Sequence, residues 1–450
     1  MASKDFTIAF VGGGMVGLAC AIPLSHAGFK VDVYESAKEF GEVGAGVVLA
    51  CNGRCALKGL GLLDPLYAQL GEAKNNLLTA FQFISGVGDN ELIYPANERI
   101  LGLYRPDYMD AIMPLIDPSI VHFGKQCILV DKTPPEVSGG RPTTTLHFAD
   151  GTTAVADLVI GADGIKSITR RYVTGSDDSR LSFTGTSLYR DLIPMEDLRK
   201  AGVKTELLGR QLSWFHHDKH LICFPVKNDT ILNVGAFPRN DPVLAGEKPG
   251  PWVEQAPQQE LLDDFPGWGR DAQIILDHMK APGKWYIHHV SPVLESYVKD
   301  HVVLIGDAAH GMLPHLGAGL NQGFEDAYTL YRLLTHPKTN FSNLRYVLEI
   351  YSSFRSPRAN MVLTRTARMG EIYDEHETSG GDNQKFIDSL QDMWTPIWGY
   401  YIDEEVDALL ERLGMVAEPT NWDAQAKFGV GKSVQPQGTS YFTSTVRALS

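Results

Sequence analysis

Residues 5–36 of this 450-residue chain read DFTIAFVGGGMVGLACAIPLSHAGFKVDVYES. The apolar run after Asp5 predicts a short buried strand. The segment that follows the glycines has apolar residues at helical spacing, which predicts a helix that ends at Gly28. The next segment, FKVDVYE, predicts a second strand. A strand, a helix and a second strand form a βαβ unit, so the sequence predicts a parallel sheet.

The turn of this unit carries the spacing Gly12-x-Gly14-x-x-Gly17. Gly12 permits the tight turn, Gly14 lets a pyrophosphate approach the backbone, and Gly17 lets helix and strand pack closely. Glu35 ends the second strand, where a carboxylate accepts hydrogen bonds from a ribose diol. The combination predicts a bound dinucleotide and disfavours a 2′-phosphate at this position.

A second glycine-rich stretch, GDAAHGMLPHLGAGLNQGFEDA, spans residues 306–327. Asp307 follows a strand-like run, and its carboxylate can accept a hydroxyl hydrogen bond. The loop behind it points backbone N–H groups and a helix N-terminus at an anion; it consists of Leu316, Gly317, Ala318, Gly319 and Leu320. A flavin dinucleotide fits both stretches, with adenosine and pyrophosphate at residues 12–35 and the ribityl chain and ring edge here.

Three segments resemble, in order, the fingerprints of the single-component FAD-dependent aromatic hydroxylases: VGGGMVGL with Glu35, ADLVIGADGIKSITR, and the stretch at 306–327. The resemblance covers residues 5–375 and is greatest to the salicylate hydroxylase group. It implies the para-hydroxybenzoate hydroxylase fold, in which a Rossmann-like FAD-binding domain carries an inserted, mainly antiparallel substrate-binding sheet. It also implies that NADH or NADPH and O2 are co-substrates and that hydroxylation proceeds through a flavin C4a-hydroperoxide.

The resemblance assigns further roles. Arg105 in GLYRPDYMDAI is expected to contact the flavin, and Asp163 to be a shared flavin and nicotinamide contact. His315 is expected to face the substrate hydroxyl, where an imidazole can accept a phenolic proton, while Pro314 stiffens its loop. Arg190, in SLYRDLIP, is expected to pair with a substrate carboxylate or with the flavin.

Other residues have structural interpretations. We read His310 as structural, because the motif places it beside the strand end. We expect Arg355 and Arg358, in YSSFRSPRANMVLTRTARMGEIY, to make structural contacts on a solvated helix face.

Strand patterns and helical stretches alternate in a way that divides the chain. We expect an FAD-binding domain in two parts at 1–179 and 291–375, an inserted sheet domain at 180–290, C-terminal helices at 376–415, and a polar tail at 416–450.

Composition narrows the class of protein. A net charge of −14 argues against a nucleic-acid partner. Five scattered cysteines, no signal-like N-terminus and no apolar run long enough for a membrane span predict a cytoplasmic location. We find no metal-ligand spacing and expect a monomer or homodimer.

The sequence therefore predicts an FAD monooxygenase of a small aromatic acid or phenol, with the decarboxylating conversion of salicylate to catechol as the leading reaction. Two alternatives stay open. One is a monooxygenase of a larger polyketide or indole, and the other is an FAD-binding protein without catalytic activity.

Overall fold

The computed structural model describes residues 5–40, 45–88, 91–96, 98–134, 141–175, 180–216, 219–238, 251–378 and 383–414, with only the backbone for 374–378. The predicted polar tail at 416–450 lies outside the described residues. Within the described part, no helix is both long and apolar enough to cross a lipid bilayer.

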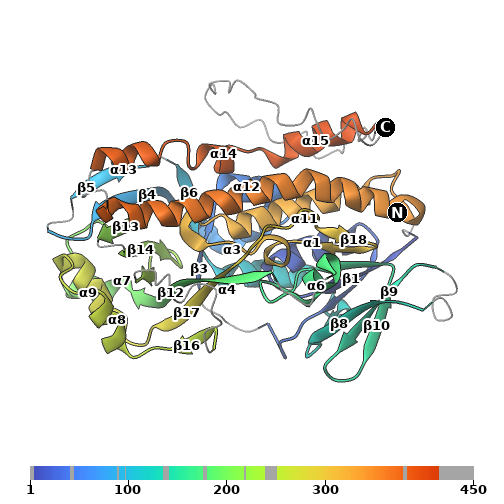
Figure 1. Ribbon diagram of the computed structural model, residues 1–450, viewed down its shortest axis with the longest axis horizontal. Coiled ribbons are helices and arrows are strands. Elements are labelled where there is room, and N and C mark those ends of the chain that lie inside the picture. The colour runs from blue at the N-terminus through green and yellow to red at the C-terminus, as the bar shows by residue number, and fades with distance from the viewer. Residues whose placement is uncertain are drawn as a thin grey trace.

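A six-stranded sheet carries the glycine motifs (Figure 1). Its strands run in the order β18 (Val298–Lys299), β19 (Val302–Leu304), β11 (Leu158–Gly161), β1 (Thr7–Val11), β2 (Lys30–Tyr34) and β7 (Val121–His122). All neighbours pair in parallel except β18 with β19, so the carboxyl ends of five adjacent strands share one edge. The predicted βαβ unit is confirmed, and the chain order reverses at β1, where such sheets open a crevice for ligands.

A ten-stranded, mainly antiparallel sheet forms the second part. Its strands are β16 (Val253–Gln255), β17 (Gly283–Val290), β12 (Leu181–Pro194), β15 (Ile231–Phe237), β14 (Lys219–Val226), β13 (Arg210–His216), β4 (Leu77–Ser85), β6 (Arg99–Tyr104) and β3 (Gly46–Leu49) in that order, with β5 (Leu92–Pro95) beside β4. The strands from 181–290 fit the predicted inserted sheet. The strands from 46–104 extend it, which the sequence did not indicate.

Side chains alternate between the two faces of this sheet, as the two-residue period of strands requires. On one face, residues such as Trp214 and Leu221 pack against α8 (Gln258–Asp264) and α9 (Arg270–His278). On the other face, residues such as Phe215 and Phe224 pack against helices from the C-terminal part of the chain. This second face also contacts the loop before α11, so it is the face that bears on function.

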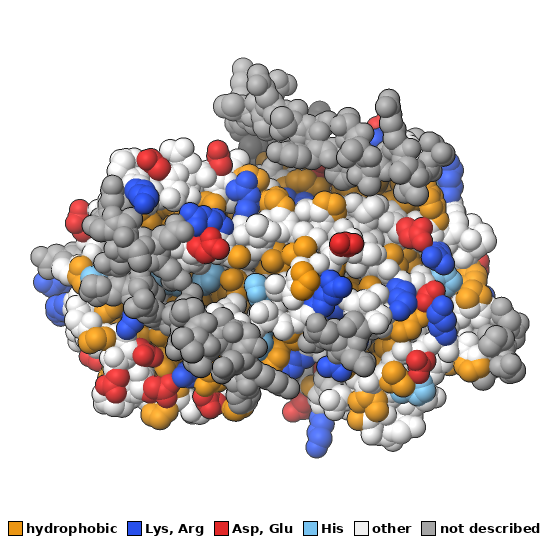
Figure 2. Space-filling view, in the orientation of Figure 1, with side chains coloured by type: hydrophobic (Ala, Val, Ile, Leu, Met, Phe, Trp, Pro, Cys, Tyr) orange, Lys and Arg blue, Asp and Glu red, His pale blue; other side chains and the backbone are white. Residues whose placement is uncertain are grey.

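The remaining elements cover these sheets (Figure 1). A small sheet contains β8 (Cys127–Lys132), β9 (Thr144–Phe148) and β10 (Thr153–Ala156), with a turn at Asp150-Gly151 between β9 and β10. The other helices are α1 (Met15–His26), α2 (Cys51–Gly59), α3 (Leu63–Leu70), α4 (Arg105–Ile112), α6 (Ile168–Thr174), α7 (Met195–Lys200), α10 (Asp307–His310), α11 (Gly319–Thr335), α12 (Leu344–Thr378), α13 (Asn383–Ser389), α14 (Thr395–Trp398) and α15 (Ile402–Arg412). On the face shown in Figure 2, acidic and basic side chains are interspersed.

A buried group of charges joins α10, α11 and α12, and we call it the ion cluster. Arg355 donates to Glu325 at 2.7 Å and to Asp326 at 2.8 Å, and Arg358 donates to Glu325 at 2.7 Å. His310 Nε2 lies 2.6 Å from Asp326, which fits its predicted structural role. The prediction that Arg355 and Arg358 lie on a solvated face is wrong, because helix packing buries both against these carboxylates.

Candidate active site

The three sequence motifs meet at the carboxyl edge of the parallel sheet. Gly12 N–H donates to Tyr34 O at 2.9 Å, Ala162 N–H to Val11 O at 2.8 Å, and Ile305 N–H to Gly161 O at 2.9 Å. These bonds align the turns after β1, β11 and β19. Residues separated by nearly 300 positions therefore lie together at this edge, which we call the crevice because sheets of this topology bind ligands there.

The glycines of the first turn serve two different needs. Gly12 has φ +103°, and a Cβ there would lie 2.3 Å from Ala162 O; a Cβ on Gly17 would lie 2.3 Å from Gly12 O. Both positions exclude a side chain. A Cβ on Gly14 would meet nothing within 4 Å, although Gly14 begins α1. The open space in front of this helix N-terminus suits a pyrophosphate.

Glu35 reaches the same turn. Its Oε2 accepts from Gly13 N–H at 2.8 Å, and its Oε1 accepts from Ala37 N–H at 2.8 Å. The carboxylate therefore stands beside the glycines at the end of β2, where a ribose diol of a bound dinucleotide would meet it.

Asp307 faces the start of α11. Its residue is exposed, and a Cβ placed on Gly319 would lie 3.9 Å from Asp307 Oδ1. Desolvation by the surrounding protein raises the pKa of the Asp307 carboxyl. Gly317 adopts φ +58°, and α11 begins without a side-chain cap. Its N–H groups are therefore available to an anionic ring edge.

The segment at 45–50 connects the predicted flavin contacts. Arg105 N–H donates to Ala45 O at 3.0 Å, and Arg190 Nη2 donates to Gly46 O at 3.1 Å. Asn321, which the sequence did not single out, donates to Val48 O and Gly317 O at 3.0 Å each. The crevice, the open helix N-termini and this connection together fit an extended FAD.

The carboxylate of Asp163 is hydrogen-bonded to groups of the protein. Its carboxylate accepts from the Ser167 and Thr169 hydroxyls at 2.6 Å each, and from the N–H groups of Ile168 at 2.7 Å and Thr169 at 3.0 Å. Four donors fill the lone pairs of a carboxylate. Asp163 therefore holds the start of α6 and the backbone turn at Gly164, which leaves no carboxylate lone pair for direct contact with a cofactor.

His315 is placed by the short helical turn Pro314–Leu316. Thr366 on α12 holds this turn, because its hydroxyl donates to Leu313 O at 2.8 Å and accepts from Leu316 N–H at 3.3 Å. Pro314 is exposed and begins the turn, whereas His315 is buried. Burial lowers the pKa of His315 to about 4, so the imidazole is neutral near pH 7.

His220 and Tyr373 lie beside His315, and Ser213 lies beside Tyr373. We call these four buried residues the polar cluster: Ser213, His220, His315 and Tyr373. The ring of His220 is sandwiched between Phe237 at 4.2 Å and Tyr373 at 4.1 Å, and lies 5.3 Å from His315. Burial and the neighbouring His315 lower the pKa of His220 well below its ordinary value.

The polar cluster is short of hydrogen bonds. Among the described residues, both ring nitrogens of His220 and Nδ1 of His315 are buried without a hydrogen-bond partner. Unpaired buried polar groups are uncommon and costly, so each needs an explanation. No local sequence pattern predicts this cluster. The lone histidine in the apolar strand HLICFPV was its only signal.

Arg190 does not join His315 in the polar cluster. It pairs across the sheet with Gly235, and its guanidinium reaches toward Gly46, which packs on Asn233. His220 lies two strands and two residues away, on the order of 12 Å by strand geometry. The structure therefore puts Arg190 on the side of the segment at 45–50.

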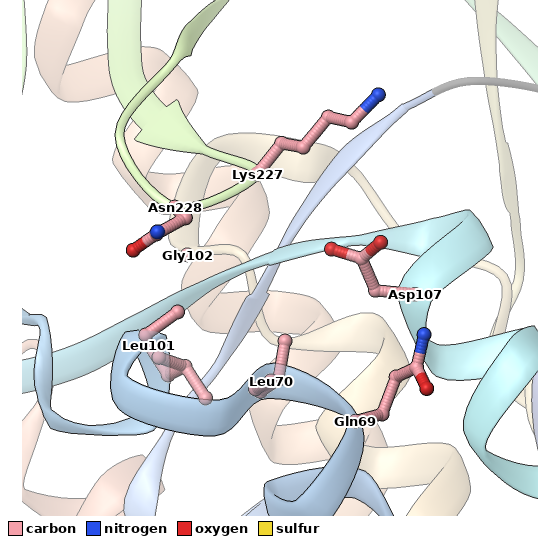
Figure 3. A pocket seen from close by; sticks show the side chains of 8 residues that line it. Gln69, Leu70, Leu101, Gly102, Asp107, Lys227 and Asn228 are labelled. Carbon is pink, nitrogen blue, oxygen red and sulfur yellow. The ribbon is translucent and has the colours of Figure 1, made fainter.

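A separate small pocket of about 200 Å³ lies between α3, β6, α4 and the turn after β14 (Figure 3). Asp107, whose pKa is raised by burial, lines it. None of the predicted site residues does. In the described part, no group of histidine, cysteine or carboxylate side chains is arranged to hold a metal ion.

Known proteins resemble this chain in sequence and in fold. Residues 135–366 match the family model described as an FAD binding domain, and residues 11–48 match an NAD(P)-binding Rossmann-like domain. The chain is 36% identical over 423 residues to a salicylate hydroxylase of Pseudomonas putida, covering 90% of this chain and 95% of that protein. It is 32% identical over 422 residues to a 6-methylsalicylate 1-monooxygenase of Aspergillus terreus, covering 89% of each.

A solved salicylate hydroxylase substrate complex superposes with a TM-score of 0.75 at 29% identity, covering 93% of this chain and 99% of that one. These matches confirm the predicted fold, a Rossmann-like FAD-binding part with a mainly antiparallel sheet, and they confirm FAD as the cofactor.

Proposed function

The chain belongs to the FAD-dependent aromatic monooxygenases, and from this premise we propose that it hydroxylates a phenolic acid at the expense of NAD(P)H and O2. Salicylate is the leading substrate. Salicylate, NAD(P)H, O2 and two protons would give catechol, CO2, NAD(P)⁺ and water. The salicylate hydroxylase and 6-methylsalicylate 1-monooxygenase relatives support this class of substrate.

The polar cluster is the observation that carries the proposal. It lies on the sheet face that meets the loop of α11, where the ring edge of FAD would end. Hydrogen-bonding groups without protein partners are what a polar aromatic ligand needs. A phenol offers one donor and one acceptor, which complement a neutral imidazole and the neighbouring hydroxyls.

His315 would act as the general base toward the phenolic hydroxyl. Its lowered pKa keeps it unprotonated at neutral pH, and a substrate carboxylate nearby would raise that pKa and favour proton transfer. Ser213 and Tyr373 would donate to the phenolate oxygen that forms. The phenolate directs electron density to its ring carbons, including the carbon that bears the carboxylate.

Bound FAD supplies the electron transfer and the activation of O2 in this chemistry. The residues of the chain would position the cofactor and the substrate. Gly14, Glu35 and Asp307 would hold FAD, and the stacked His220 and Phe237 would orient the substrate ring. Attack at the carboxyl-bearing carbon would favour loss of CO2, because the ring regains aromaticity.

A larger aromatic natural product is the second candidate substrate. Fungal FAD-dependent monooxygenases of Gibberella moniliformis and Monascus ruber are 29% and 30% identical to this chain over 88–90% of its length. The aromatic side chains around the polar cluster, among them Phe83 and Trp394, would pack equally well on a wider ring system.

The test is a panel of phenolic acids with the FAD-loaded protein, scored for NAD(P)H consumption, peroxide and product mass. We expect salicylate to lose its carboxylate and gain a hydroxyl with little peroxide. Benzoate, which lacks the phenolic hydroxyl, is the matched control and should be unreactive. NAD(P)H oxidation that yields only peroxide with every phenolic acid would contradict the proposal.

A further inference from the structure

The last residues of β17 border the crevice of the parallel sheet. Val290 N–H donates to Gly311 O at 2.8 Å, and a Cβ on Gly311 would lie 3.0 Å from Ile165. The end of β17 therefore touches the loop after Asp307, and that loop touches the turn after Asp163. This edge lies across β11 from the glycine turn after β1.

Three side chains form a column at this edge, and we call it the Trp252 stack: Lys166, Trp252 and His288. The rings of Trp252 and His288 stack at 3.7 Å with 3° between their planes. Lys166 Nζ lies over the Trp252 ring at 4.3 Å from its centroid. Because the imidazole fills one face of the indole, the ammonium covers the other.

The charge of Lys166 is available to a ligand. Lys166 is exposed, and within the described ranges it makes no ion pair, although the chain carries a net charge of −14. A cation–π contact at an exposed site is worth only about 0.5–1 kcal/mol. A phosphate would therefore draw the ammonium away from the indole at little cost.

A second dinucleotide cannot use the usual anion site of the fold. FAD needs the glycine turn and the N-terminus of α1, and Asp163 already occupies the N-terminus of α6 with four hydrogen bonds. A second pyrophosphate beside the crevice must therefore be bound by side chains. Lys166 is the exposed cation next to that capped turn.

We propose that the Trp252 stack is the docking site for NAD(P)H, with Lys166 binding the pyrophosphate and the Trp252 indole stacking on one of its bases. The inference rests on the proposed function, since the hydroxylation needs this hydride donor. The site would let NAD(P)H dock from solvent and let NAD(P)⁺ leave while FAD stays bound.

Binding of NAD⁺ and NADP⁺ to the FAD-loaded protein tests this directly. Calorimetric dissociation constants should rise about 10- to 100-fold in Lys166→Glu and about tenfold in Trp252→Ala, whereas Lys166→Arg should stay near the parent value. Lys58→Glu, on α2, makes the same charge change at another exposed position and should have no effect. An unchanged dissociation constant in both Lys166→Glu and Trp252→Ala would overturn the proposal.

A second measurement separates docking from hydroxylation. The variants should be reduced slowly by NAD(P)H at low concentration, but dithionite should reduce them normally, and the reduced proteins should hydroxylate the substrate normally when mixed with O2. Loss of FAD content in parallel with the NAD⁺ affinity would overturn the docking role. Normal NAD⁺ binding without any hydroxylated product would instead contradict the proposed function.

Discussion

His310 ends α10 and His315 lies five residues later in the turn Pro314–Leu316, yet the two side chains have different surroundings. His310 lies in the ion cluster, where its Nε2 pairs with Asp326 and the Arg355 guanidinium pairs with both Glu325 and Asp326. Of these groups, only Nδ1 of His310 has no hydrogen-bond partner in the described part. His315 lies in the polar cluster, where its Nδ1 and both ring nitrogens of His220 have no hydrogen-bond partner in the described part. Both sites are closed to solvent, so burial alone does not distinguish them.

The difference shows how to read a buried polar group. Paired charges hold two helices in one arrangement, and removing one of them leaves its partner uncompensated. Unpaired polar groups add no comparable stability to the fold, and a bound ligand can supply their missing hydrogen bonds. Mutations in the ion cluster should therefore change the stability of the protein, and mutations in the polar cluster should change hydroxylation.

The largest expected effect is on hydroxylation by His315→Ala. Loss of the base should slow hydroxylation by about 10²–10⁴-fold and increase peroxide release, because proton transfer from the phenol is lost. FAD content should persist, since other residues hold FAD. Rapid-mixing kinetics across pH measure this, and His278→Ala on α9 is the control. A variant with the parental rate and pH profile would remove His315 from the mechanism.

Arg355→Ala should have the largest effect on stability. It leaves Glu325 and Asp326 short of a buried counter-charge, which costs about 3–5 kcal/mol. Urea unfolding measures this. Arg345→Ala breaks only the exposed pair with Glu349 and should cost less than about 0.5 kcal/mol. Equal costs for the two variants would show that the ion cluster is not structural.

The sequence could predict the crevice but not the clusters. The glycine spacing, Glu35 and Asp307 are local signals, and β-sheet topology brings them together. The polar cluster needs Ser213, His220 and Tyr373, which come from two strands and a helix and meet only through packing. The burial of Arg355 could not be predicted, because arginine is seldom fully buried and no local pattern reveals a carboxylate on another helix.

The pH dependence of stability separates the clusters further. His315 has its pKa lowered from about 6.5 to about 4, so between these pH values the unfolded chain binds a proton that the folded protein excludes. Stability should therefore fall as pH drops through this window, by about 1.4 kcal/mol per pH unit for this group. His315→Gln should flatten the slope, as measured by urea unfolding at several pH values. A slope unchanged by the substitution would mean that His315 is protonated in the folded protein.

The carboxylates of the crevice should affect FAD more than the fold. Asp307 makes no side-chain hydrogen bond within the described residues, so Asp307→Ala should weaken FAD retention by about 1–3 kcal/mol and leave stability of the FAD-free protein nearly unchanged. Glu35→Ala should weaken retention similarly, with loss of its bond to Gly13. Flavin fluorescence during dilution measures retention, with Asp64→Ala on α3 as control. Unchanged retention in both variants would remove these residues from the FAD site.

The smallest effect makes the finest test of the comparison. His220→Phe removes two buried ring nitrogens that have no hydrogen-bond partner in the described part, while an aromatic ring stays between Phe237 and Tyr373. Stability should therefore stay constant or rise, by up to about 1 kcal/mol, because an unpaired buried polar group costs its lost hydration. Tyr351→Phe is the matched variant, since its hydroxyl donates to Leu304 O at 3.0 Å and its loss should cost about 1 kcal/mol. Unfolding in urea compares the two, and substrate affinity should fall only in His220→Phe. If both variants lose equal stability, the His220 ring nitrogens already have partners in the ligand-free protein, and the polar cluster would be one more structural network.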